Sequence, residues 1–348
     1  MKFSLSDFDY DLPRELIAAY PPEDRPSARL LKVDRKTGNF SHHIFREVAQ
    51  FFQPGDVLVL NNTKVRAARI FGTKPTGGKV EALLLKEQGE NKWESLLRPG
   101  GRIKKGMVIT FGENGTRLEA EVLDDGMRDS GQRLIGFRGT EIKDKLDKIG
   151  HIPLPPYLDR PDSEIDRTFY QTVFAKTEGA VASPTAGLHF DLNLLEEMHK
   201  RGVEIVQVTL HTSYGTFQPI VEEDLRNQKL FPEDIEITSD AAEVINKALD
   251  EKRRVIACGT TSVRTLESAV NAQGRIEPLK GQTQLLIYPP YEFKIVSGMI
   301  TNFHLPKSSL LLLVAALLDG REKLMNVYAE AIREHYRFYS YGDAMVIL

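Results

Sequence analysis

The sequence has little cysteine, and this excludes several kinds of site. Its 348 residues contain one cysteine, Cys258, so no disulfide forms within the chain. One thiol also cannot build a thiolate zinc site, and neither an HExxH segment nor paired CxxC segments occur. We therefore expect no bound metal and a reducing compartment. Cys258 follows the apolar run RVIA, which indicates a small buried residue and not a catalytic thiol.

Long apolar segments and cofactor fingerprints are also missing. The longest apolar run, residues 310–318, is well short of the ~20 residues that a membrane-spanning helix needs. The opening MKFSLSDFDYDLP has early acidic residues and no apolar signal region. The glycine-rich dinucleotide fingerprint and the GxSxG elbow do not occur. We expect a cytoplasmic protein with no membrane partner.

Positive charge is scarce overall but concentrated in one segment. The formal net charge is −3, which argues against a surface that binds nucleic acid everywhere. Residues 60–106 contain eleven Lys or Arg against four Asp or Glu, a surplus of +7, so the remainder carries −10. This asymmetry is typical of an acidic body with one basic, RNA-facing surface. Solvated lysines on strand edges are the alternative explanation.

The alternation of helices and strands changes twice along the chain. Strand DVLVLN from Asp56, strand VEIVQVTLH and a helix capped by Asp191 are typical of an α/β body, a mostly parallel sheet with helices on both faces. Between residues 70 and 150, near-alternating runs such as KVEALLLKE and RLEAEVL, separated by Gly-rich turns, indicate an antiparallel β-barrel. We expect residues 1–69 and 151–348 to form the α/β catalytic body, and residues 70–150 to form an inserted β-barrel domain.

A helix start in GTTSVR is a candidate anion site. An apolar strand ends before Gly259, and two hydroxyl residues then begin a helix whose free N–H groups can bind an anion. Thr260, Thr261 and Arg264 are therefore candidates for holding a carboxylate or an RNA phosphate. A plain helix cap is the alternative, and the Gly-Lys-Ser/Thr ending of a P-loop is absent.

Three histidines occupy junctions of the same type. His189 lies in PTAGLHF, His211 in TLHTSYGTF and His304 in NFHLP, where α/β sheets place their ligands. A single histidine there is more often structural, but three such junctions favour a shared pocket. The residues by themselves thus indicate a polar α/β pocket without naming a reaction.

Six blocks of the chain resemble one known family. They are NNTKVRAAR, PPYLDRPDSEIDRTFYQTVFAK, PTAGLHF, GTTSVRTLES, NFHLPKSSLLLLVAAL and RFYSYGDAMVIL. In this order, and across nearly the whole chain, they resemble the S-adenosylmethionine:tRNA ribosyltransferase-isomerases of queuosine biosynthesis (the QueA family). Several long blocks in the right order are a far stronger signal than one short motif.

The resemblance implies the same two-domain plan and an enzyme that uses S-adenosylmethionine as a ribosyl donor. The implied acceptor is 7-aminomethyl-7-deazaguanine at the tRNA wobble position, and the implied products are epoxyqueuosine-tRNA, adenine and methionine. S-adenosylmethionine is consumed as a substrate, and no cofactor is implied. We expect a monomer that binds the tRNA anticodon loop.

This chemistry assigns roles to the polar residues. A base must remove a 5′ proton, the adenine needs a proton or a hydrogen-bond donor, and histidines titrate in a suitable range. The expected catalytic residues are His189, His211, His304 and Asp343, and the expected substrate-binding residues are Thr185, Thr260, Thr261, Arg264, Asn302 and Tyr341. The expected RNA-binding residues are Lys64, Arg66, Arg69, Arg98, Arg102, Lys104 and Lys105. Phe338, Tyr339 and Tyr341 are candidates for stacking on the wobble base, although two of the three are also interpretable as core.

The chain departs from the family pattern at three places. Ser213 and Tyr214 are bulkier than a small Gly-rich turn, and residues 228–231 stand where the family has a His-x-Met-His-type stretch. Gln284 replaces an acidic residue before the IYP segment. These changes leave open a paralogue with a small-molecule acceptor, or an RNA-binding member without catalysis.

Overall fold

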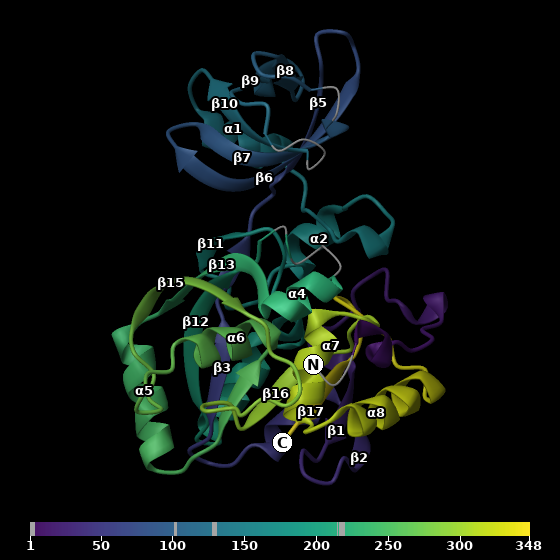
Figure 1. The fold of residues 1–348 in the computed structure, drawn as a ribbon, viewed down its shortest axis with the longest axis vertical. Coiled ribbons are helices and arrows are strands. Elements are labelled where there is room, and N and C mark those ends of the chain that lie inside the picture. Colours follow the sequence, from purple (N-terminus) through teal and green to yellow (C-terminus); the bar gives the residue numbers. More distant parts are fainter. Residues whose placement is uncertain (1–3, 101–102, 127–130, 214, 216–219) are drawn as a thin grey trace. The chain divides into compact units, whose positions relative to one another are not determined.

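A computed structural model describes residues 4–100, 103–126, 131–213, 215 and 220–348. Two residues singled out from the sequence, Arg102 and Tyr214, lie outside this part. The chain divides into two compact units, the first made of residues 1–64, 156–160 and 169–348 and the second of residues 65–155 and 161–168 (Figure 1). Two of these limits lie about five residues from the limits that the sequence pattern predicts, after residues 69 and 150.

The first unit is built on a nine-stranded mixed sheet. In sheet order its strands are β15 (Leu279–Leu285), β13 (Lys229–Ile237), β12 (Glu204–His211), β3 (Val57–Asn61), β14 (Val255–Cys258), β16 (Gly298–Asn302), β17 (Ala344–Ile347), β1 (Arg29–Val33) and β2 (Phe40–Ile44). Strands β12, β3, β14 and β16 run parallel, and so do β17 and β1. The remaining neighbours pair antiparallel. The predicted α/β class is confirmed, with its parallel core extended by antiparallel pairs.

Helices cover both faces of this sheet, as predicted. Successive strand residues point to opposite faces. Val57 and Val59 of β3 therefore join one buried cluster, whereas Leu58 and Leu60 join another. The first cluster includes α5 (Ser239–Asp250), α6 (Thr260–Ser268), α7 (Ser309–Leu317) and α8 (Arg321–Arg333), and the second includes α3 (Leu192–Lys200) and the 3₁₀ helix η4 (Phe45–Phe51).

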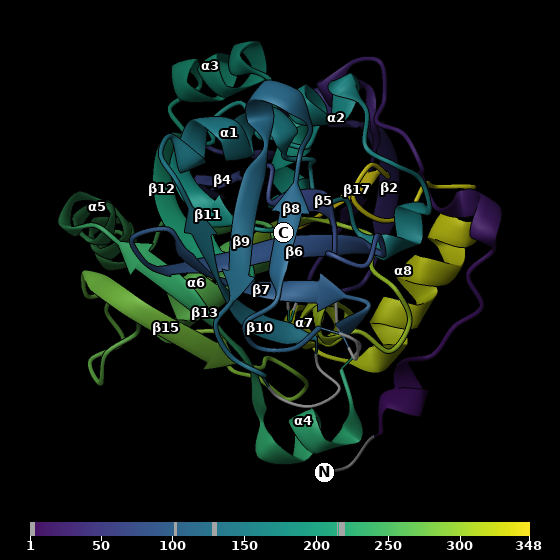
Figure 2. The same ribbon diagram turned by 90° about the horizontal axis from the view of Figure 1, so that it is seen from above.

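The second unit contains a closed barrel of six antiparallel strands, which confirms the predicted barrel (Figures 1 and 2). The strands are β5 (Arg69–Thr73), β6 (Lys79–Gly89), β7 (Lys92–Arg98), β8 (Val108–Phe111), β9 (Leu118–Val122) and β10 (Gln132–Arg138). In β9, Leu118, Ala120 and Val122 are buried while the two intervening glutamates are partly exposed. This period of two is the alternation that the sequence displays.

The remaining elements are short. Strands β4 (Thr63–Val65) and β11 (Thr177–Ala180) pair with each other. The other helices are α1 (Ile142–Ile149), α2 (Glu164–Phe169) and α4 (Glu222–Asn227), and the other 3₁₀ turns are η1 (Leu5–Phe8), η2 (Arg14–Leu16), η3 (Arg25–Ser27), η6 (Asn114–Thr116), η7 (Pro156–Leu158) and η8 (Thr185–His189). In the segment LPRELIAAY only η2 forms, because Ile17 is extended and pairs with Phe338.

The predicted burial of Cys258 and of the apolar run 310–318 is confirmed. Cys258 is 2% exposed, and burial raises the pKa of its thiol. The apolar run 310–318 forms α7, and most of its side chains are buried in the first cluster. Among the described residues, no helix has both the length and the apolar character needed to cross a membrane.

Candidate active site

Polar residues lie at the carboxyl ends of four neighbouring parallel strands. Strand β12 ends at His211, β3 at Asn61 and β16 at Asn302, while β14 runs directly into Gly259 and helix α6. Parallel strands place these ends along one edge of the sheet, where open α/β sheets bind their ligands. The candidate site is therefore an edge of the first unit.

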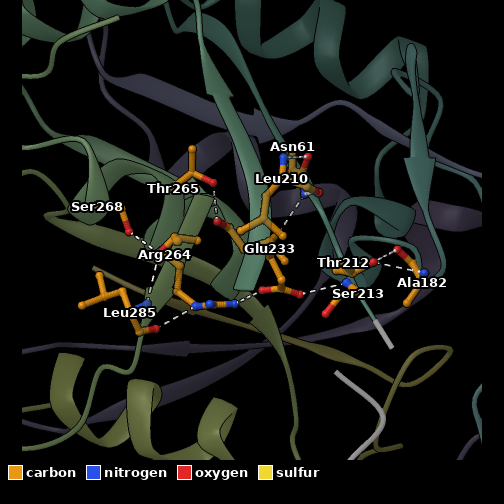
Figure 3. A network of polar contacts seen from close by, with 12 residues as sticks. Asn61, Ala182, Leu210, Thr212, Ser213, Glu233, Arg264, Thr265, Ser268 and Leu285 are labelled. Carbon is orange, nitrogen blue, oxygen red and sulfur yellow. Dashed lines mark hydrogen bonds and ion pairs between the residues drawn. The ribbon is translucent and has the colours of Figure 1, made fainter. Parts of the chain in front are cut away.

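Asn61 connects three elements at this edge. Its Oδ1 accepts the N–H groups of Leu210, at 3.0 Å, and of Thr63, at 3.1 Å. Its Nδ2 donates to the Leu210 carbonyl, at 3.0 Å, and to Thr261 Oγ1, at 3.1 Å (Figure 3). The amide uses both its donors and both its acceptor sites, so it fixes β3, β12 and α6 relative to one another. Asn61 was not among the predicted site residues, although a polar residue closing an apolar strand was a usable signal.

His211 adjoins this connection. Its Nδ1 lies 2.7 Å from Thr63 Oγ1, and the imidazole is half-buried. The backbone of Gly179 passes close to the ring, since a Cβ added there would lie 2.7 Å from Nδ1. The ring is thus positioned by a hydroxyl on one side and by a glycine on the other.

Arg264 and Glu233 form a buried ion pair next to the same edge. Arg264 lies on α6, four residues after Thr260, and its Nε donates to the Leu285 carbonyl at 2.9 Å. Its Nη1 donates to Glu233 Oε2, and Glu233 Oε1 accepts the N–H of Ser213 at 3.2 Å (Figure 3). The two side chains are 8% and 4% exposed. Within the described part of the chain, Arg264 Nη2 is buried without a hydrogen-bond partner.

A pocket of about 60 Å³ opens beside this pair. Its lining includes Ser213, Gly215, Asp224, Phe231, Glu233 and Arg264. A Cβ on Gly215 would lie 2.5 Å from the Phe231 side chain, so that close approach requires glycine. Two of the three departures from the family pattern therefore contribute to one pocket wall. Glu233, on the unpredicted strand β13, is the residue that sequence reasoning missed here.

Asn302 organises a second polar cluster with η8. Its Oδ1 accepts the Thr185 hydroxyl at 2.9 Å, and its Nδ2 lies 3.1 Å from both the Tyr339 carbonyl and His189 Nε2. A carbonyl can only accept, so the amide nitrogen faces it and His189 Nε2 accepts as well. Burial, with smaller contributions from Arg337 and Arg25, lowers the pKa of His189 to about 3. His189 is therefore a neutral ring at physiological pH.

His304 and Asp343 hold other parts of the fold together. His304 Nε2 lies 2.8 Å from Thr301 Oγ1, and burial lowers the pKa of His304 to about 3. The Asp343 carboxylate accepts the N–H groups of Arg29, at 2.8 Å, and of Arg337, at 2.7 Å. Burial raises the pKa of Asp343, while these backbone bonds oppose the shift. Both oxygens of Asp343 thus join β1 to the segment before β17.

The three aromatic candidates differ in exposure. Phe338 is 0% exposed and Tyr341 is 2% exposed, so both belong to the core. Tyr339 is half-buried, and its ring centroid lies 3.8 Å from that of Tyr157. Tyr339 is therefore the one of these three that is not fully buried.

The basic residues also fall into two groups. Arg98, Lys104 and Lys105 of the second unit are exposed. Lys64, Arg66 and Arg69 are half-buried: Lys64 Nζ lies 2.8 Å from Glu178, Arg66 lies 5.2 Å from the Trp93 ring centroid, and Arg69 lies 3.1 Å from Glu81. The exposed group remains the better candidate for phosphate contacts.

The structure brings the predicted residues together in two adjoining sets. Thr261 and His211 connect through Asn61, Leu210 and Thr63, whereas Thr185, His189 and Asn302 bond to one another. A Cβ on Gly259, just before Thr260, would lie 3.7 Å from Ala186 of η8, so the sets are neighbours. Among the described residues, the pocket lining includes Arg264 and none of the three candidate histidines. A single cleft shared by all of them stays a prediction.

Comparisons with known proteins show the family of this chain. The sequence profile of the queuosine biosynthesis protein family matches residues 5–347. The chain is 48% identical over 343 residues to the S-adenosylmethionine:tRNA ribosyltransferase-isomerase of Clostridioides difficile, which covers 98% of each chain. It is 48% identical over 346 residues to the protein of the same name from Desulforamulus reducens, with 99% of each chain covered. A crystal structure of S-adenosylmethionine tRNA ribosyltransferase from Thermotoga maritima matches with a TM-score of 0.55 and 34% identity, over 98% of this chain and 100% of that one. The chain belongs to the queuosine biosynthesis protein family.

Proposed function

We propose that this chain is an S-adenosylmethionine:tRNA ribosyltransferase-isomerase. It transfers and isomerises the ribosyl moiety of S-adenosylmethionine onto 7-aminomethyl-7-deazaguanine at the tRNA wobble position, giving epoxyqueuosine-tRNA, adenine and methionine. The observation that carries the proposal is the 48% identity over 98% of both chains with an enzyme of that name. The enzyme acts as a cytoplasmic monomer on the anticodon loop.

His211 is the base that suits this reaction best. The sulfonium acidifies the hydrogens on the neighbouring 5′ carbon, so a side chain must accept one of them. His211 is half-buried at the end of β12, beside the Asn61 connection. Burial lowers the pKa values of His189 and His304 to about 3, so neither ring holds a proton readily near neutral pH. We assign these two histidines to positioning the polar edge, His189 through Asn302 and His304 through Thr301.

A product assay tests the proposal directly. The protein is incubated with S-adenosylmethionine and tRNA that carries 7-aminomethyl-7-deazaguanine, the tRNA is digested, and its nucleosides are identified by mass spectrometry. Epoxyqueuosine and free adenine are the expected products. Adenine without epoxyqueuosine would indicate another acceptor, and tRNA binding without either product would indicate a binding protein.

The tRNA contact is tested through its dependence on salt. Affinity for tRNA falls as salt rises, and each lost phosphate contact makes the slope of log affinity against log salt shallower by roughly 0.7–0.9. The triple variant Arg98→Ala, Lys104→Ala, Lys105→Ala should bind tRNA more weakly and with a shallower slope in filter binding. Lys36→Ala, Lys247→Ala, Lys252→Ala removes the same charge from exposed positions of the first unit and serves as the matched control. Equal slopes for the two triple variants would refute this surface.

A further inference from the structure

We infer that the pocket beside Arg264 binds the α-amino and α-carboxylate groups of S-adenosylmethionine. This inference rests on the proposed function and assigns one end of its substrate to one place. The carboxylate binds Arg264, and the ammonium group faces Asp224 and Glu233, which also line the pocket.

Arg264 lines the pocket and has one donor that the fold does not use. Its Nε and Nη1 donate to Leu285 and Glu233, while Nη2 is buried without a partner in the described part of the chain. The side chain is 8% exposed, and a buried donor without an acceptor is costly. Hydrogen bonds from a guanidinium to a carboxylate are among the strong ones. A ligand carboxylate would therefore supply the acceptor that Arg264 Nη2 lacks.

The charges in the pocket favour a group that has both an ammonium and a carboxylate over a phosphate. Arg264, Glu233 and Asp224 together carry a formal charge of −1. S-adenosylmethionine carries a sulfonium, an ammonium and a carboxylate, hence a formal charge of +1 at neutral pH. Asp224 is held at the pocket because its Oδ2 accepts the N–H of Val221 at 2.9 Å. A phosphate dianion would face two fixed carboxylates there and is disfavoured.

The size and position of the pocket agree with this ligand end. A volume of about 60 Å³ corresponds to roughly two water molecules at about 30 Å³ each, so the pocket has room for one small polar end of the ligand and not for the whole molecule. Leu230, Phe231 and Leu310 add an apolar wall for the methylene chain. Arg264 lies four residues after Thr260 on α6, about one helical turn from the strand edge. The sulfonium and the ribosyl group then lie towards Asn61 and His211.

The test compares S-adenosylmethionine with its decarboxylated analogue, which keeps the sulfonium and the ammonium group. Dissociation constants are measured by calorimetry on the full chain. The unmodified protein should bind S-adenosylmethionine about 10- to 100-fold more tightly than the analogue, as expected for charged hydrogen bonds. The double variant Arg264→Gln, Glu233→Gln removes both charges without leaving one unpaired, and it should bind the two ligands about equally.

Two further variants keep the test decisive. The double variant Arg254→Gln, Asp56→Asn neutralises another buried pair, at the opposite ends of β14 and β3, and should keep the full preference. Ser309→Phe fills the pocket while leaving the Arg264 pair intact, and it should weaken S-adenosylmethionine binding at least tenfold. A preference that survives in Arg264→Gln, Glu233→Gln, or unchanged binding in Ser309→Phe, overturns the inference. If the unmodified protein neither binds nor converts S-adenosylmethionine, the proposed function itself fails.

Discussion

The two ends of strands β3 and β14 have ion pairs with a buried carboxylate, and the two pairs differ in their hydrogen bonding. At the amino ends, Arg254 contacts Asp56 through Nε and Nη2, and Nη2 also donates to the Phe51 carbonyl at 3.0 Å. Asp56 accepts the Gln53 N–H as well, at 2.6 Å. Past the carboxyl ends, Arg264 also pairs with a glutamate but leaves Nη2 without a partner in the described structure. In the described structure, no buried atom of the amino-end pair lacks a hydrogen-bond partner, whereas the carboxyl-end pair has one such donor.

Other buried polar side chains without hydrogen-bond partners also lie near the carboxyl ends of these strands. In the described part of the first unit, the buried side-chain atoms without partners belong to Thr172, Ser183, Ser213, Arg264 and Tyr339. Ser213 follows β12, the Tyr339 carbonyl bonds to Asn302, and Thr172 and Ser183 lie beside η8. A native fold usually satisfies its buried polar groups, so a cluster of exceptions indicates an unfilled binding edge. In the described part of the first unit, buried polar groups without partners therefore gather near the carboxyl ends of these strands, where we propose that the substrate binds.

Of the variants proposed to test this difference between the two strand ends, replacement of His211 should have the largest effect, and it should lower turnover. If His211 is the base at the open edge, His211→Ala should lower turnover by about 10²- to 10⁴-fold, the usual contribution of general-base catalysis. Binding of S-adenosylmethionine should change little, because the proposed contact of His211 is with the 5′ proton. Single-turnover kinetics with the modified tRNA measures this. A loss smaller than tenfold, or an equal loss in Arg254→Gln, Asp56→Asn, would assign the base elsewhere.

Breaking the Arg264 pair from one side should destabilise the fold. Arg264→Gln removes the buried guanidinium that pairs with Glu233, and breaking a buried ion pair from one side typically costs about 3–5 kcal/mol in the free energy of unfolding. Arg264→Gln, Glu233→Gln should recover most of that loss in urea denaturation. Arg254→Gln should cost less, because Arg254 is 31% exposed and water can approach the remaining Asp56. If the double variant is as unstable as the single one, packing and not charge explains the effect.

The sequence was most informative where residues follow a regular period. Alternation in segments such as 118–122 predicted the barrel, and apolar runs such as 57–61 predicted strands buried on both faces. Strand β13 was missed because its first four residues are mostly exposed and include Pro232, so no clear alternation begins there. Its Glu233 was therefore missed too.

Pairings between distant residues were beyond the sequence. Arg264 was expected to bind an external anion, yet Glu233, 31 positions earlier, already takes one of its donors. The catalytic role expected of Asp343 stays a prediction, and the sequence did not show that each of its oxygens accepts a backbone N–H. Residue type and position identified the polar edge, but only the spatial arrangement separates complete pairs from incomplete ones.

Acid should destabilise the fold through the buried histidines. Unfolded His189 gains its proton below about pH 6.5, whereas burial lowers the folded pKa to about 3. The unfolded state therefore binds more protons between these values, and the free energy of unfolding falls by roughly 1.4 kcal/mol per pH unit as pH drops through this window. His189→Gln should flatten the slope between pH 6.5 and 5 by about that amount in urea denaturation. The exposed His199→Gln is the control, and equal slopes for both variants would contradict the effect.

The smallest expected effect concerns a complete polar contact close to the open edge. Asp191, two residues after His189, caps α3 because its Oδ1 accepts the Leu194 N–H at 2.7 Å. Asp191→Ala should lower the free energy of unfolding by about 1 kcal/mol, as the loss of a helix cap usually does. Turnover should stay unchanged, because the carboxylate already has its partner within the fold. Thermal melts and the product assay, run on the same sample, measure both quantities. If the folded variant loses more than threefold in turnover, a polar group with all its hydrogen bonds inside the fold can still be functional. The contrast drawn here between structural and functional polar groups would then fail.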